Sequence, residues 1–281
     1  MSAPDLALPD VAALEARLRR EPDDDETWLV YADWLIERGD VRGELLQLAA
    51  RPRTNETMAA MAAIEAEHGD GWLSDVPNDV MVLESRAGFV LRARVFWSVD
   101  GAPPVEALLA LPCARLLHTL ELRGSATDLA GLSALDLRRL AVLDCAYVPI
   151  GAAGAIEIAA ARLSELRALD LRYGRIGDRG AAALAGAPSL ARLERLHLQR
   201  NDLGPEGARA LAGATFTELE ELDLRYSPIG ADGARALSSA TFARSLRRLG
   251  LHREDVGPDG ARVLATAESA SPAIQRLWAT A

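Results

Sequence analysis

The stretch LRALDLRYGRIGDRGAAALAGA, from Leu166 to Ala187, decides how this chain folds. Along a strand, Leu169 and Leu171 point to one face and the residues between and beyond them point to the other. An isoleucine and a glycine follow, and then a G-A-x-x-L spacing that is typical of a helix. The stretch therefore predicts one strand followed by one short helix.

The same pattern recurs along the C-terminal two-thirds of the chain. Units aligned on the second leucine are spaced 23 to 28 residues apart and centre on Leu120, Leu143, Leu169, Leu196, Leu222, Leu249 and Leu277. A weaker unit, VLRARV, centres on Ala93. One unit cannot bury both of its faces alone, so neighbouring units must stack, with parallel strands in one curved sheet and helices outside. The chain is thus predicted to form an α/β solenoid.

The helical half of each unit has its own markers. Pro205 and Pro258 suit the first turn of a helix, where the missing N–H and fixed φ of proline cost nothing. Glycine and alanine should allow close approach on the inner side. The apolar anchor of each helix is expected to be Leu184, Leu211, Leu237 and Leu264.

These units resemble the leucine-rich repeat family, in its ribonuclease-inhibitor-like subtype, with the pattern L-x-x-L-x-L-x-x-N followed by IG-x-x-GA-x-x-LA. The similarity covers residues 89–281 and implies a right-handed solenoid, with the parallel sheet inside and short helices outside. The asparagine of the family pattern is present only as Asn201, and the equivalent positions are Val148, Gly174, Ser227 and Glu254. The missing asparagines are expected to make the turns less regular and not to change the fold.

The N-terminal part has helical spacing. Helices are expected from Asp10 to Arg20, as a hairpin from Thr27 to Ala50 closed by Gly39, and from Thr54 to His68 up to the stop at Gly69–Gly71. The inward residues are expected to be Leu29, Ala32, Leu35, Ile36, Met58, Met61 and Ile64. We therefore predict an all-α module over residues 1–78 and a horseshoe over residues 79–281, with a capping hairpin at 79–97 that turns at 85–88.

This module is similar to the bacterial repeat-companion domain found at the start of paralogous proteins in myxobacteria and planctomycetes. The matching segments are LVYADWLIERGDVRGELLQL, EHGDGWL and GFV. The family has no established biochemistry, so the resemblance implies no activity. Trp28, Tyr31 and Trp34 are interpreted as packing residues rather than as a ligand cage.

Composition restricts the function. The net charge of −10 argues against binding to a phosphate backbone, and the absence of any lysine excludes P-loop and Schiff-base lysines. The all-arginine usage is typical of a GC-rich bacterial genome. No secretory signal or membrane-spanning stretch is evident, so we expect a cytoplasmic protein. Cys113 and Cys145 are too few for a disulfide framework, and Cys145 takes the place of a core leucine.

No catalytic, cofactor or metal site is predicted, because none of the common catalytic motifs occurs. The acidic residues Asp33, Glu37, Asp40 and Glu44 are interpreted as helix caps and exposed charge. A metal-dependent enzyme built on Asp33, Glu37 and Glu44 is the alternative to that interpretation.

The solvent-facing positions of the predicted sheet carry columns of acid, arginine and tyrosine. Arginine and tyrosine are enriched at binding hot spots, which favours a binding surface on the concave face. Copying of near-identical repeats would produce the same columns without any ligand. The candidate protein-binding residues are Asp170, Arg172, Tyr173, His197, Arg200, Asp223, Arg225, Tyr226, His252 and Arg253.

The prediction is a non-enzymatic scaffold that binds a protein partner of unknown identity, with no nucleic acid and no membrane involved. The alternative is a sensor in which the N-terminal helices are the effector and the repeats only detect a ligand. We expect a monomer rather than a dimer. A last strand is expected at Ile274 to Trp278, with an edge that either caps the stack or pairs with a second chain.

Overall fold

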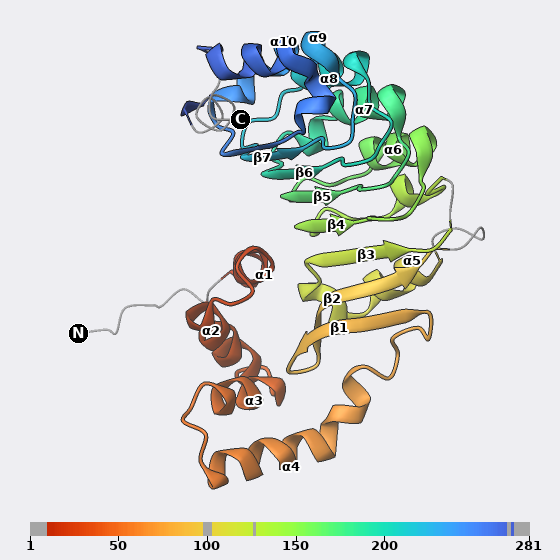
Figure 1. Cartoon of the computed structure of the whole chain (residues 1–281). Helices are drawn as coiled ribbons and strands as arrows, with labels where there is room; N and C mark the ends of the chain where they lie inside the picture. The colour runs from red at the N-terminus through yellow and green to blue at the C-terminus, as the bar shows by residue number, and fades with distance from the viewer. Residues whose placement is uncertain (1–9, 98–102, 126–127, 269–270, 273–281) are drawn as a thin grey trace. The chain divides into compact units, whose positions relative to one another are not determined.

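The computed structural model describes residues 10–97, 103–125, 128–268 and 271–272 (Figure 1). The predicted last strand at 274–278 lies outside these residues. The chain forms two compact units, one of residues 1–93 with 107–118 and the other of residues 94–106 with 119–281. The predicted division after residue 78 stays a prediction.

Four helices begin the first unit: α1 (Val11–Arg20), α2 (Asp25–Ile36), α3 (Arg42–Ala49) and α4 (Asn55–Trp72). Asp10 caps α1, since its carboxylate accepts a hydrogen bond from the amide of Ala12 at 3.0 Å. Asp24 caps α2 in the same way. Gly39 follows α2 with φ +71°, as expected for a helix end that glycine closes.

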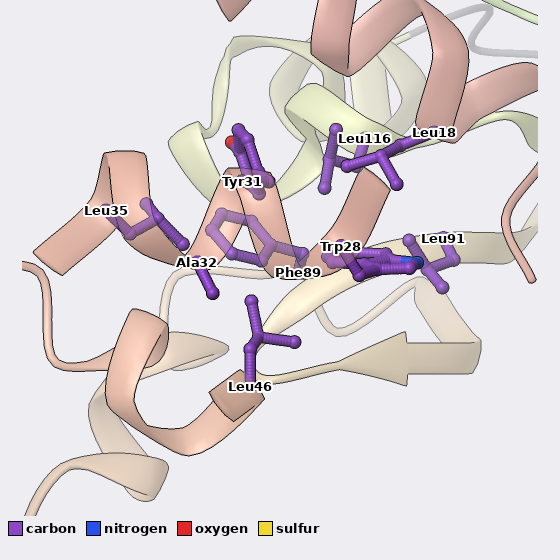
Figure 2. Close-up of a cluster of buried hydrophobic side chains, with 9 residues drawn as sticks. All are labelled: Leu18, Trp28, Tyr31, Ala32, Leu35, Leu46, Phe89, Leu91 and Leu116. Atoms are coloured by element: carbon purple, nitrogen blue, oxygen red, sulfur yellow. The ribbon is translucent and has the colours of Figure 1, made fainter. Parts of the chain in front are cut away.

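Aromatic and aliphatic side chains together form the core of the first unit, which Figure 2 shows. Trp28 and Tyr31 are 1% and 0% exposed, and the ring of Tyr31 lies 5.8 Å from that of Phe89. The indole N–H of Trp28 donates to the carbonyl of Pro22 at 2.7 Å. The prediction that these aromatic residues pack in the core is confirmed, with Trp34 partly buried against the same cluster.

Three expectations for these helices were wrong. Leu29 is 40% exposed, because the buried face of α2 is set by Trp28, Tyr31 and Leu35 instead. Helix α4 continues through the Gly69–Gly71 segment to Trp72, and Met58 is 56% exposed. A glycine inside a helix costs only about 1 kcal/mol relative to alanine, which is too little to end a helix by itself.

The predicted hairpin is formed by β1 (Val80–Arg86) and β2 (Phe89–Phe96). Its two-residue turn has φ of 47° at Ala87 and 73° at Gly88, the left-handed values that tight hairpins need. A Cβ on Gly88 would also come within 2.7 Å of Trp72, so glycine is required there for space as well.

Within the second unit the strands follow one another in chain order, from β3 to β8. The second unit contributes short strands that pair in parallel and begin with β3 (Thr119–Arg123). The later strands are β4 (Val142–Asp144), β5 (Ala168–Asp170), β6 (Arg195–His197), β7 (Glu221–Asp223) and β8 (Arg248–Gly250). In every pair the second leucines face each other, from Leu120 and Leu143 to Leu222 and Leu249, which confirms the predicted alignment of the units.

Short helices lie on one side of these strands (Figure 1). They are α5 (Pro103–Ala110), α6 (Gly151–Ala160), α7 (Gly177–Ala185), α8 (Pro205–Ala212), α9 (Gly230–Ser238) and α10 (Arg253–Thr266), with 3₁₀ turns at Pro112–Leu116, Leu132–Ala134, Pro188–Leu190 and Thr241–Arg244. Pro205 begins α8 as predicted. In α10 a first turn precedes Pro258, and the helix kinks at Gly257 because that glycine has non-helical backbone angles.

The helices pack as the sequence predicts. Their leucine anchors are at most 1% exposed: Leu184, Leu211, Leu237 and Leu264. A Cβ on Gly180 would lie 3.0 Å from the Cβ of Ala155, so glycine there lets α7 approach α6 closely. Asn201 is fully buried and links turns, with its amide donating to the carbonyl of Leu171 at 2.8 Å. Asp178 adds a second link by accepting from the amides of Gly204 and Gly207.

Candidate functional site

The acidic column of the sheet is in register across the strands. Glu121 pairs with Asp144, Asp144 with Asp170, and His197 with both Asp170 and Asp223. Residues side by side in a parallel sheet are about 4.8 Å apart, so like charges in this column would repel one another without neutralising partners.

Arginines two residues further along the chain neutralise these carboxylates. Arg172 contacts Asp170 at 2.6 Å, and Arg225 contacts Asp223 at 2.6 Å. Each carboxylate also accepts a hydrogen bond from the backbone amide of its arginine at 3.1 Å, which stabilises the turn after the strand. Asp223 is only 3% exposed. The aspartates of the column therefore hold the arginines and the turns in place.

The first strands of the second unit have a similar network, which sequence inspection missed. Arg123 contacts both Glu121 and Asp144 at 3.0 Å, and Arg94 contacts Glu121 at 2.7 Å. Glu121 is fully buried. The sequence signal was an arginine two residues after the acidic residue of a repeat, as Arg123 follows Glu121, but Arg94 lies in the weaker repeat VLRARV that centres on Ala93.

His197 takes the place of an aspartate in the central repeat. Its Nδ1 lies 3.7 Å from Asp170 and its Nε2 lies 3.3 Å from Glu221. The nearby carboxylates of Asp170 and Glu221 raise the pKa of His197. Burial alone would raise the pKa of Asp170, but the neighbouring His197 and the hydrogen bonds from Arg172 lower it to about 2. The position between two carboxylates therefore favours the imidazolium form.

Counted from the first leucine of L-x-x-L-x-L, the eighth residue of each repeat lies beyond the strand. Tyr147, Tyr173, Arg200 and Tyr226 each come three residues after a strand ends, with φ between 53° and 66°. This left-handed conformation costs a non-glycine residue about 1–2 kcal/mol. Because parallel strands end at the same edge of the sheet, the four side chains project from its carboxyl edge.

These side chains stack on one another and continue to His252. We call Tyr147, Tyr173, Arg200, Tyr226 and His252 the edge ladder. The rings of Tyr147 and Tyr173 are 4.7 Å apart, and those of Tyr226 and His252 are also 4.7 Å apart. The Cζ atom of Arg200 lies 5.5 Å from the ring centroid of Tyr173 and 4.2 Å from that of Tyr226. The tyrosines are 63%, 41% and 52% exposed in chain order.

The ladder differs from the candidate set at both ends. Tyr147 belongs to it, although it was not among the candidate residues, and its place in the tyrosine column is the sequence signal that could have found it. Arg253 does not extend it, because Arg253 is the first residue of α10 and His252 contacts Tyr226 instead. The structure thus brings together nine of the ten candidates, either in the ladder or in the charged column beside it.

The acidic residues of the N-terminal helices are engaged locally. Asp33 accepts a hydrogen bond from Gln47 at 2.6 Å, and Asp40 pairs with Arg42. Asp40, Arg42 and His68 line an open cavity of about 620 Å³ within the first unit. Among the residues that the structure describes, no group of three or more histidine, cysteine or carboxylate side chains is arranged to hold a metal ion.

Three stretches of the second unit match a known sequence family. Residues 164–185, 192–212 and 217–238 each match the family model for the leucine-rich repeat. The chain contains leucine-rich repeats. The matches cover β5 to α9, which carry most of the edge ladder. No curated protein matches the chain.

Proteins built from leucine-rich repeats generally mediate protein–protein interaction and typically are not enzymes.

A bilayer-crossing helix must be both long and apolar, and none in the described part of this chain meets both conditions.

Proposed function

We propose that this protein is a non-enzymatic interaction module that binds a protein partner through its sheet face and edge ladder. The repeats would belong to the ribonuclease-inhibitor-like subtype, and the ten candidate residues would form or support the surface. The observation that carries the proposal is the ladder itself, in which three tyrosines remain 41% to 63% exposed in left-handed turns.

Two physical arguments support binding over simple copying of repeats. Exposed tyrosine rings gain free energy when a partner covers them, and their stacking on neighbours lowers the entropy lost on binding. Backbone strain is retained at four successive turns, where glycine or asparagine would avoid it. Copying explains why the columns recur, but it does not explain the different residues of the central repeat.

The test is affinity purification with mass spectrometry from the native host. The bait is the full chain, compared with a double variant, Arg172→Ala with Tyr226→Ala, which removes exposed side chains but leaves the leucine core intact. Arg179→Ala on the outer side of α7 is the matched control. A protein recovered with the wild type and the control but lost with the double variant supports the proposal, whereas equal recovery by all three contradicts it.

A second candidate function makes the N-terminal helices, as a repeat-companion domain, the effector. The cavity of about 620 Å³ in the first unit favours it, since Arg38, Arg42 and His68 supply donors around an open space. Residues 1–78 alone are unsuitable for the test because Phe89, Leu91 and Leu116 belong to the core of this unit. This function predicts that, in the full chain, His68→Ala abolishes the binding of a partner that the double variant Arg172→Ala with Tyr226→Ala still binds.

A further inference from the structure

We propose that Arg200 is an anchor for a carboxylate of the protein partner, so that the edge ladder recognises an acidic peptide segment. This inference rests on the proposed function and names the chemistry of the ligand at that same surface. The carboxylate would accept two parallel hydrogen bonds from the guanidinium, between the rings of Tyr173 and Tyr226.

The first argument is how Arg200 is held. Its guanidinium carbon lies within 6 Å of two tyrosine rings, from the repeat before it and the repeat after it. Contacts with ring faces restrict the side chain but use none of its five N–H donors. A fixed guanidinium with free donors is preorganised for a planar, bidentate acceptor such as a carboxylate.

The second argument is that Arg200 has no acidic partner. Arg172 and Arg225 are each bound to the aspartate of their own repeat at 2.6 Å. Among the described residues, no carboxylate oxygen lies within 4.0 Å of the Arg200 guanidinium, and its side chain donates no hydrogen bond. Arg200 is nevertheless exposed. Its charge is therefore available to a ligand.

The third argument is the sequence of the central repeat. The repeats on either side read D-L-R-Y, at Asp170–Tyr173 and Asp223–Tyr226, but the central repeat reads H-L-Q-R, at His197–Arg200. The change removes the aspartate that would neutralise an arginine and moves the arginine to the ladder. The side-chain amide of Gln199 donates a hydrogen bond to Asp223, so the glutamine that replaces arginine still binds the acidic column. Because the central repeat differs from its neighbours, one unpaired guanidinium lies in the middle of the ladder.

The fourth argument is charge complementarity. The column beside the ladder is neutralised internally, with Asp170 and Asp223 each held by arginine. A basic partner would find these carboxylates already occupied and would meet Arg200 as a like charge. An acidic segment finds an unpaired guanidinium that two tyrosine rings hold in place.

The experiment selects binders for the full chain from a displayed library of short random linear peptides. The selected peptides are synthesised and their dissociation constants are measured with wild type, Arg200→Met, Arg200→Lys and Arg179→Met. Arg179→Met removes the same charge from the exposed surface of α7 and is the matched control. A further variant, Tyr173→Ala with Tyr226→Ala, reports whether a peptide uses the ladder at all, and circular dichroism checks that each variant is folded.

The expected result is enrichment of aspartate and glutamate in the selected peptides and a loss of affinity of about tenfold to a hundredfold with Arg200→Met. Arg200→Lys should lose a smaller factor, since it keeps the charge but not the planar pair of donors, and Arg179→Met should leave binding unchanged. Peptides that need the tyrosines but are neither acidic nor sensitive to Arg200→Met would overturn this inference while sustaining the proposed function. If no selected peptide responds to the tyrosine variant, both are overturned.

Discussion

The guanidinium carbon of Arg200 lies 4.2 Å from the ring centroid of Tyr226, although the two residues belong to different repeats. Each of them follows a strand by three residues and has a left-handed backbone. The contact exists because the strands are in register and the turns after them share one conformation. The ladder is therefore a property of the stack of repeats and not of any single repeat.

The strain in these turns can be measured at Tyr173. Both Tyr173→Ala and Tyr173→Gly remove the ring and its contacts, but only glycine accepts φ +62° without a steric cost. We expect the glycine variant to be more stable than the alanine variant by about 1 kcal/mol in free energy of unfolding. Denaturant unfolding of the two proteins gives the difference. Equal stability, or a more stable alanine variant, would show that the turn is not strained.

Stability at His197 should depend on pH. The pKa of His197 is raised in the folded chain, so its contribution is fully present below the unfolded pKa of about 6.5 and is lost as pH rises through the folded value. His197→Gln should therefore cost more stability at about pH 6 than at about pH 8. Denaturant midpoints of the two proteins at both pH values test this. The buried His118, whose pKa is lowered to about 4, is present in both proteins and cancels in the comparison. A difference in stability between the two proteins that does not change with pH, or that is larger at the higher pH, would contradict the prediction.

Gly180 inside α7 and Gly186 at its C-terminal cap make a matched pair for helix packing. A Cβ on Gly180 would lie 3.0 Å from the Cβ of Ala155 in α6, whereas on Gly186 it would meet nothing closer than 3.5 Å. Gly180→Ala should lower the free energy of unfolding by about 1–3 kcal/mol because the helices must move apart. Gly186→Ala should be neutral or slightly stabilising. Thermal or denaturant unfolding separates the two, and similar effects from both would argue against the close approach.

Cys145 should resist thiol reagents. It is fully buried, and burial raises the pKa of its thiol, so little thiolate is available to react. In a Cys113→Ser background, labelling by a colorimetric disulfide reagent should be slow in buffer and fast in denaturant. Rapid labelling of the folded protein would show that the repeat around Cys145 opens readily.

Much of the second unit could be predicted from the sequence. The leucine spacing located every strand from β3 to β8 and the pairing of their central leucines, because alternation along a strand dictates which residues are buried. The burial of the Cys145 thiol followed from the same alternation, and the left-handed backbone of Gly39 followed from its place at the end of a helix. The helical unit was less predictable, since Leu29 and Met58 have helical spacing but are exposed.

The candidate site was predicted in composition but not in arrangement. The columns placed the residues at positions five and seven side by side, as the structure does, but the bonds from Arg172 and Arg225 to aspartate make those aspartates supports for the arginines. Spacing along the chain does not show which donor satisfies which acceptor. It also could not show that Arg253 would enter a helix and that His252 would contact Tyr226.

In the second unit, the sequence by itself determined the repeat, its strands and helices, and the residues that face the core, because these follow from periodicities of two and of about 3.6 residues. The tertiary structure alone decided that the eighth positions leave the strand in left-handed turns and stack across repeats. It also decided that Arg200 lies between two tyrosines, with no carboxylate from the described residues paired to it. These features depend on lateral distances between repeats, which are set when the strands pair and not by any pattern within one unit.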